Sequence, residues 1–179
     1  MKKNLLLTGR PQMGKSALIR RVVERLRELG CTPIGGFYTL EVSEGGARVG
    51  FDIHTLDGRI GPLARAGLES RYQLGRYGID MEQFESVALP ALEGAIRQGG
   101  LVVIDEIGYM ELKSGRFREL VEEALASPAP MLATIMRSRF DFAEAVKRRG
   151  DVTVILVTVE NRDRLVEEIV ERIRELPGA

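Results

Sequence analysis

Residues 9–16 read GRPQMGKS and fit the pattern G-x-x-x-x-G-K-[ST], in which consecutive backbone N–H groups cradle phosphate oxygens. Four fixed positions arise by chance in roughly one chain per hundred of this length, so the flanking sequence decides how the octet is interpreted. The apolar run 4–8 before it favours a buried parallel strand, and ALIRRVVERLREL after it has the apolar spacing of a helix. Strand, glycine loop and helix in this order are the setting in which the pattern binds phosphate. The alternative is an ordinary glycine turn that leads into a helix.

The octet predicts a site for a nucleoside triphosphate such as ATP or GTP. We expect contacts from all of its residues: Gly9, Arg10, Pro11, Gln12, Met13, Gly14, Lys15 and Ser16. Glycine permits a close approach of the backbone, and the first turn of a helix favours an anion. Lys15 should reach the β- and γ-phosphate oxygens and assist catalysis, and the Ser16 hydroxyl should bind Mg²⁺.

A second motif, LVVIDEIG at residues 101–108, brings two acids to the end of a buried strand. The carboxyl ends of parallel strands form the edge at which open α/β sheets bind ligands. Asp105 is the expected Mg²⁺ carboxylate, acting directly or through water. Glu106 should point to the other side of the chain and orient or deprotonate the attacking water, which favours hydrolysis over transfer. The alternative is a solvated pair of acids at the end of a core strand.

The order of apolar segments predicts an α/β fold with a mostly parallel central sheet, flanking helices and an inserted antiparallel hairpin. Strands are expected at 4–8, 101–104, 131–136 and 152–159, and the hairpin at 37–42 and 47–55. Helices are expected after the octet, at 80–98 with a break or bend at Pro90, at 115–126, at 140–149 and around 165–173. The glycine- and arginine-rich stretch 57–78 is interpreted as an irregular excursion.

Composition narrows the class of protein. The chain has 179 residues, which predicts one domain spanning 1–179, and it is 44% hydrophobic and 29% charged. Its 26 basic and 26 acidic residues balance, so nucleic-acid binding is not expected. A single cysteine, no apolar run of membrane-spanning length and no leader-like segment predict a cytoplasmic protein.

With both motifs in place, the chain resembles the THEP family of nucleoside-triphosphatases, also called cancer-related nucleoside-triphosphatases. The resemblance lies in GRPQMGKS, in GFYTLEV and GFDIHTLDG, in DEIGYMEL and in ENRD, which together span most of the chain. It implies a P-loop NTPase fold and a Mg²⁺-dependent enzyme that hydrolyses ATP, GTP and other nucleoside triphosphates to diphosphate and phosphate. It also implies nucleotide contacts along 9–16 and around 101–108, including Gly108. Tyr109 stands where the family pattern leads us to expect lysine, so a cation is missing there.

Several arginines are candidates for an arginine finger, a side chain that stabilises charge on the transferred phosphate. Four lie in the stretch 57–78, at Arg59, Arg65, Arg71 and Arg76, and two follow the third core strand, at Arg137 and Arg139. The first four fit an ordinary basic surface equally well. A scan of single Arg→Ala variants separates these interpretations.

The segment Glu160–Asp163 follows the last strand, where P-loop proteins often contact the base. Asn161 could bind a purine edge and Arg162 could stack on it, although helix capping by Asn161 explains the same residues. His54 is interpreted as structural, and Cys31 has no partner for metal or nucleophilic chemistry.

Two further functions stay open beside hydrolysis. A small-molecule kinase of this architecture would replace water with a bound hydroxyl group. A nucleotide-gated switch, or a nucleic-acid partner that uses the arginines of 59–76, would show slow basal turnover that a partner stimulates, and any affinity for nucleic acid would fall with salt. Phosphate release without an added acceptor distinguishes hydrolysis from the kinase.

Overall fold

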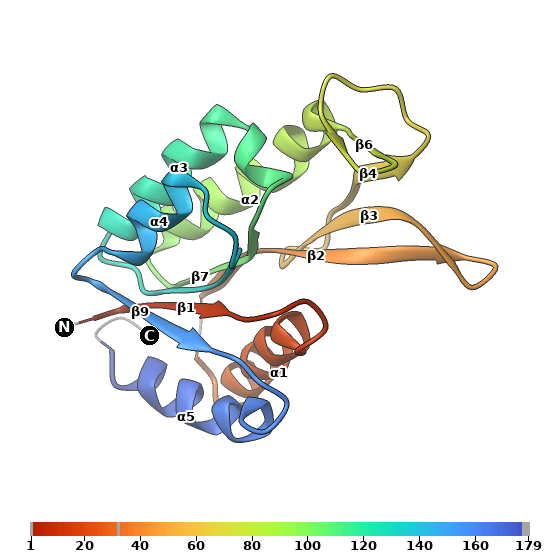
Figure 1. The fold of residues 1–179 in the computed structure, drawn as a ribbon. Coiled ribbons are helices and arrows are strands. Elements are labelled where there is room, and N and C mark those ends of the chain that lie inside the picture. Colours follow the sequence, from red (N-terminus) through yellow and green to blue (C-terminus); the bar gives the residue numbers. More distant parts are fainter. Residues whose placement is uncertain (1, 32, 177–179) are drawn as a thin grey trace.

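The computed structural model describes residues 2–31 and 33–176 (Figure 1). The described strands form one nine-stranded sheet in the order β5-β6-β4-β3-β2-β7-β8-β1-β9. The strands are β1 (Asn4–Thr8), β2 (Ile34–Glu44), β3 (Ala47–Thr55), β4 (Ile60–Ala66), β5 (Gln73–Leu74), β6 (Tyr77–Ile79), β7 (Leu101–Ile107), β8 (Met131–Ile135) and β9 (Val152–Leu156). The helices are α1 (Lys15–Glu28), α2 (Met81–Gln98), α3 (Gly115–Ala126), α4 (Asp141–Lys147) and α5 (Arg162–Arg174), with a short 3₁₀ turn η1 (Glu111–Lys113).

The sheet has a parallel half and an antiparallel half that meet at β2. Strands β2, β7, β8, β1 and β9 pair in parallel, whereas β2, β3, β4, β6 and β5 pair in antiparallel fashion. The fold class is therefore the expected one, with a mostly parallel core sheet. The antiparallel hairpin is not separate from that sheet, because β2 pairs with both β7 and β3.

Helices cover both faces of the parallel half, as Figure 1 shows. Side chains alternate across a strand, and in β1 this alternation sends Leu6 to one face and Leu5 and Leu7 to the other. The Leu6 face packs against α2, α3 and α4, and the opposite face packs against α1 and α5. Burial on both faces explains why the inner parallel strands β1, β7 and β8 are largely apolar in sequence.

The prediction of an irregular excursion at 57–78 was wrong, because half of this stretch lies in the strands β4, β5 and β6. The error arose because the glycines of this stretch were interpreted as marks of turns and loops. A Cβ at Gly61 would lie 2.6 Å from Val87 on α2, so this glycine permits close packing of a strand under a helix rather than a turn. Leu63 and Ala64 of the same strand are fully buried.

Helix α2 begins where the sequence predicted it, since the Asp80 side chain accepts a 3.0 Å hydrogen bond from the Gln83 backbone N–H. Of the two effects expected at Pro90, a bend or a division, the division does not occur, because the helix continues to Gln98. One missing backbone hydrogen bond is offset here by burial of the flanking Leu89 and Leu92 against the sheet.

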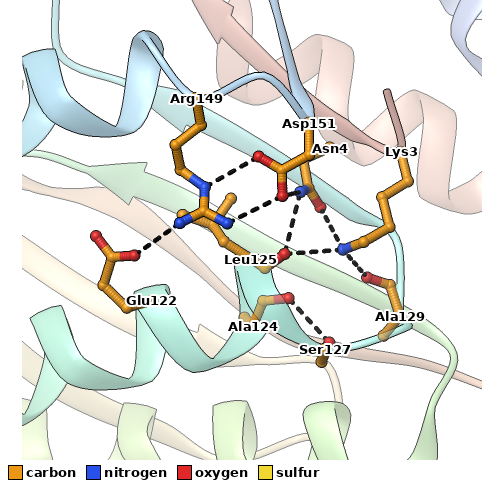
Figure 2. A network of polar contacts seen from close by, with 9 residues as sticks. All are labelled: Lys3, Asn4, Glu122, Ala124, Leu125, Ser127, Ala129, Arg149 and Asp151. Atoms are coloured by element: carbon orange, nitrogen blue, oxygen red, sulfur yellow. Dashed lines mark hydrogen bonds and ion pairs between the residues drawn. The ribbon is translucent and has the colours of Figure 1, made fainter. Parts of the chain in front are cut away.

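A polar network closes the amino-terminal ends of the parallel strands (Figure 2). Arg149 contacts Glu122 at 3.1 Å and Asp151 at 3.0 Å, and the Asn4 amide donates to Asp151 at 3.3 Å. The Lys3 ammonium donates to the backbone oxygen of Leu125 at 3.0 Å. These contacts join β1, α3 and β9 at the sheet edge opposite the glycine loop, so this edge serves the fold. Across residues 2–31 and 33–176, no helix combines the length and apolar character required to cross a bilayer.

Candidate active site at the carboxyl edge of the sheet

The glycine loop connects the end of β1 to the start of α1. Gly14 occupies the N-cap position with φ of 89°, a left-handed conformation that a side chain would strain. Gln12 also has positive φ, at 65°. The Lys15 ammonium folds back over the loop and donates to the backbone oxygens of Gly9 at 3.1 Å and Arg10 at 2.9 Å. The loop therefore gathers backbone N–H groups and one full positive charge at a helix N-terminus.

Asp105 stands at the end of β7, two strands away from β1, because β8 lies between them. It is 1% exposed, and its Oδ1 accepts a 2.6 Å hydrogen bond from the Thr134 hydroxyl on β8. Its Oδ2 is buried and has no hydrogen-bond partner within the described residues. Burial raises the pKa of Asp105, although the Thr134 and Ser16 hydroxyls both act to lower it. An oxygen acceptor thus lies beside Ser16 with its bonding capacity unused.

Glu106 follows Asp105 and lines the same cavity as Lys15. Burial, and next the Asp105 carboxylate, raise the pKa of Glu106, while Lys15 acts in the opposite direction. A side chain at Gly108 would collide with the Glu106 carboxyl group, so glycine at 108 leaves room for it. Gly108 therefore lies against Glu106 and is absent from the cavity wall.

These groups face a cavity of about 620 Å³. Its wall includes seven of the residues expected from sequence, namely Pro11, Gln12, Gly14, Lys15, Ser16, Asp105 and Glu106. Other expected residues lie around it. Arg10 is exposed, Met13 packs against the core beneath α1 and α5, and Gly9 lies against the Val157 backbone.

The cavity wall also contains residues outside the set of site residues expected from sequence. They are Ala17, Arg20, Thr39, Leu40, Glu41, Phe51, Leu74, Tyr109, Met110 and Glu111. Arg20 had a usable signal, since it lies one helical turn after Ser16 and shares its face of α1. The residues from β2, β3 and β5 had none, because only the folded sheet brings these strands to the loop.

Glu111 is the most unusual of these residues. It is 2% exposed, and the Thr39 hydroxyl donates to its Oε1 at 3.4 Å. Burial, and next the Glu106 carboxylate, raise the pKa of Glu111 to about 8. Among the residues the structure describes, no three Asp, Glu, His or Cys side chains are arranged to hold a metal ion. Glu111 therefore does not form a metal cluster with Asp105 and Glu106.

None of the six candidate finger arginines lines this cavity. Arg59 pairs with Asp57 at 3.0 Å, and Arg65 pairs with Asp52 at 2.5 Å. The remaining four also lie elsewhere: Arg71 lies over the Tyr72 ring, Arg76 over the Tyr77 ring, Arg137 is exposed, and Arg139 lines a separate hollow beside α3 and α4. Arg20 is the arginine in the cavity wall.

The segment after β9 does not show the helix capping expected of the Asn161 side chain. Asn161 occupies the N-cap position of α5, but its side chain makes no capping hydrogen bond. Its Oδ1 instead accepts from the Thr158 N–H at 2.8 Å, and its amide donates to the Leu156 oxygen at 2.8 Å. Arg162 lies beside Gly14 and lines a second, smaller hollow next to the glycine loop. His54 lies within β3, paired with Tyr38 and Ile60.

A strand–loop–helix unit with a left-handed glycine cap, set in a largely parallel sheet, defines the P-loop NTPase class of folds. A sequence profile described as NTPase matches residues 4–170. Nucleoside-triphosphatase THEP1 of Thermotoga petrophila is 43% identical over 165 residues, which cover 92% of this chain and 89% of that protein. The human cancer-related nucleoside-triphosphatase is 42% identical over 183 residues, covering 95% of this chain and 96% of that protein.

Solved structures agree with the sequence comparisons. The crystal structure of THEP1 from Aquifex aeolicus matches with a TM-score of 0.87 at 32% identity, covering 96% of this chain and 99% of that chain. The solution structure of the human cancer-related nucleoside triphosphatase matches with a TM-score of 0.84 at 40% identity, covering 96% and 97%. The chain belongs to the THEP1-type nucleoside-triphosphatase family.

Proposed function

We propose that the protein hydrolyses the γ-phosphate of ATP, GTP and other nucleoside triphosphates, in a Mg²⁺-dependent reaction that yields the diphosphate and inorganic phosphate. The observation that carries this proposal is the convergence of the Lys15 ammonium, the Ser16 hydroxyl, the buried Asp105 and the partly buried Glu106 on one cavity. The names of the relatives support the same activity.

The donor set fits Mg²⁺. The buried Asp105 Oδ2 makes no hydrogen bond inside the described part of the chain, and the nearby Ser16 hydroxyl is a second hard oxygen ligand. In this proposal Ser16 and Asp105 hold the ion, while Thr134 fixes the other Asp105 oxygen. When bound, Mg²⁺ would neutralise charge on the phosphates.

Phosphate binding, charge stabilisation and proton transfer are then carried out by residues of the chain. The loop N–H groups and Lys15 bind the phosphate oxygens and stabilise the charge that develops as the bond breaks. Glu106 orients a water molecule and accepts its proton as the water oxygen attacks the γ-phosphorus. The bond between that phosphorus and the β–γ bridging oxygen breaks, and its electron pair leaves with the diphosphate. The raised pKa of Glu106 brings this group closer to neutral pH, where a general base is most effective.

The second hollow supports a place for the base. It measures about 280 Å³ and is lined by Gly14, Ala17, Leu18, Arg21, Arg162 and Asp163. Arg21 pairs with Asp163 at 2.6 Å, and both side chains are largely exposed. A base seated against this open, ion-paired wall meets few fixed donors and acceptors, which supports a broad range of accepted bases.

The test is phosphate release from ATP, GTP, CTP and UTP with and without Mg²⁺, on the wild-type chain and on Lys15→Ala. We expect release from all four nucleotides with Mg²⁺, little without it, and loss of both affinity and rate in the variant. Unchanged kinetics in Lys15→Ala would show that the glycine loop does not take part in binding or cleaving the triphosphate. Phosphate release at the same rate with and without a chelator would show that the reaction does not depend on Mg²⁺.

A further inference from the structure

The cavity extends past the hydrolytic residues on the side away from the glycine loop. In the sheet order, β7 with Glu106 lies between β2 on one side and β8 and β1 on the other. Lys15 and Ser16 approach from the β1 side, whereas Thr39, Leu40 and Glu41 come from β2. Phe51 of β3, Leu74 of β5 and the segment 109–111 complete this far part, which we call the outer chamber. Figure 1 shows the long β2–β3 hairpin and the β4–β6 unit that form this side of the molecule.

In the binding mode proposed above, the nucleotide leaves the outer chamber free. The base site proposed above lies on the opposite side of Gly14, against α1 and α5. A triphosphate that extends from that hollow across the loop places its γ-phosphate at Lys15 and Glu106. The outer chamber begins there, so a second molecule in it would meet the γ-phosphate directly.

The outer chamber has a defined chemistry. Leu40, Phe51 and Leu74 give it an apolar side. Glu41 is already paired with Arg48 at 2.8 Å, whereas the side-chain hydrogen-bond partner of Glu111 within residues 2–31 and 33–176 is the uncharged Thr39 hydroxyl. Both cations of the cavity wall, Lys15 and Arg20, belong to α1. Without a cation beside it the buried Glu111 carboxyl group keeps its proton, and an ammonium group on a ligand would stabilise the carboxylate form and supply the partner that the chain does not.

We propose that the outer chamber binds a second substrate, a small amino alcohol with an apolar body, whose ammonium pairs with Glu111 and whose hydroxyl faces Glu106. This inference rests on the proposed function, because it places the γ-phosphate at Glu106. The hydroxyl oxygen attacks the γ-phosphorus, the bond to the β–γ bridging oxygen breaks, and the diphosphate leaves with the electron pair. The hydroxyl proton passes to Glu106, and the products are a phosphate monoester and a nucleoside diphosphate.

The experiment uses 4-(aminomethyl)benzyl alcohol as the probe and methyl-labelled full-length protein saturated with ADP and Mg²⁺. We expect the probe to shift the methyl signals of Leu40 and Leu74 in nuclear magnetic resonance spectra. Leu74→Trp should fill the chamber and weaken the probe at least about tenfold, and Glu111→Gln should weaken it about tenfold by removing a charge-assisted contact. The matched control is Ile60→Trp, an exposed position of β4 outside the cavity, where affinity for the probe should not change.

The second arm adds γ-labelled ATP and follows the label. Label in a phosphate ester of the probe supports the proposal. Label only in inorganic phosphate while the probe is bound overturns the acceptor role, and it leaves hydrolysis intact. If the nucleotide displaces the probe and itself shifts the methyl signals of Leu40 and Leu74, the outer chamber is part of the nucleotide site, and the proposal of a separate site is overturned. Failure of the proposed function would appear differently, as no label released from ATP with or without the probe.

Discussion

The Thr134 hydroxyl donates a 2.6 Å hydrogen bond to Oδ1 of Asp105, and this contact leaves Oδ2 as the oxygen available beside Ser16. Thr134 lies on β8, the strand that separates β7 from β1. The strand between the two motifs therefore does more than fill the sheet, since it fixes the orientation of the acidic side chain. Partners of this kind determine how a ligating carboxylate is presented to a metal.

Thr134→Val should raise the Mg²⁺ concentration needed for half-maximal phosphate release by roughly tenfold or more, because valine keeps the shape but loses the donor. The matched control is Thr8→Val, since the Thr8 hydroxyl is also buried but makes no hydrogen bond within residues 2–31 and 33–176. Its removal should be neutral or stabilising. An unchanged Mg²⁺ requirement in Thr134→Val would separate this hydrogen bond from metal binding.

Arg20→Ala should lower kcat/KM by roughly tenfold to a hundredfold, because a charged donor at the cavity wall is lost. Arg20 lies close enough to help lower the pKa of Asp105. The control is Arg59→Ala, whose guanidinium is exposed and paired with Asp57 away from the cavity. Equal kinetics of the two variants would show that Arg20 does not contact the nucleotide.

Glu111 should make the unfolding free energy fall as the pH rises from the ordinary glutamate range toward 8. Its pKa in the folded chain is about 8, so the folded chain keeps a proton that the unfolded chain has released. Stability then decreases with pH by up to about 1.4 kcal/mol per pH unit. Denaturant unfolding of the nucleotide-free protein between about pH 5 and about pH 8 measures this slope.

Glu111→Gln should flatten that slope and stabilise the chain most at the alkaline end, because an amide carries no ionisation penalty. Glu44→Gln, at an exposed position of β2, should leave the slope unchanged. Parallel pH profiles for the wild type and Glu111→Gln would contradict the assignment.

The local elements of the fold could be predicted from sequence because their signals are local. The predicted helix 115–126 coincides with α3, and β1 has the predicted bounds. The strands β4 to β6 could not be recognised, because their glycines have the composition of turns and only pairing with β3 and packing under α2 make them strands.

The site residues also fall into those with a local sequence signal and those whose position depends on the folded sheet. Lys15, Ser16, Asp105 and Glu106 come from two contiguous motifs, and the sheet brings them to one cavity as the order of strands predicts. Glu111 has no such local signal, because the Thr39 hydroxyl that contacts it lies on β2, far away in sequence. Asn161 shows the limit of residue-type reasoning, because a residue favoured at helix caps uses its side chain to bind the preceding loop.

The most direct test of hydrolysis by a Glu106-activated water is the comparison of nucleotide affinity and single-turnover cleavage in Glu106→Gln. We expect ATP affinity within about threefold of wild type and a cleavage rate lower by roughly 10²- to 10⁴-fold, because a general base is removed. Cleavage at a rate near that of the wild type, with ATP bound normally, would contradict it.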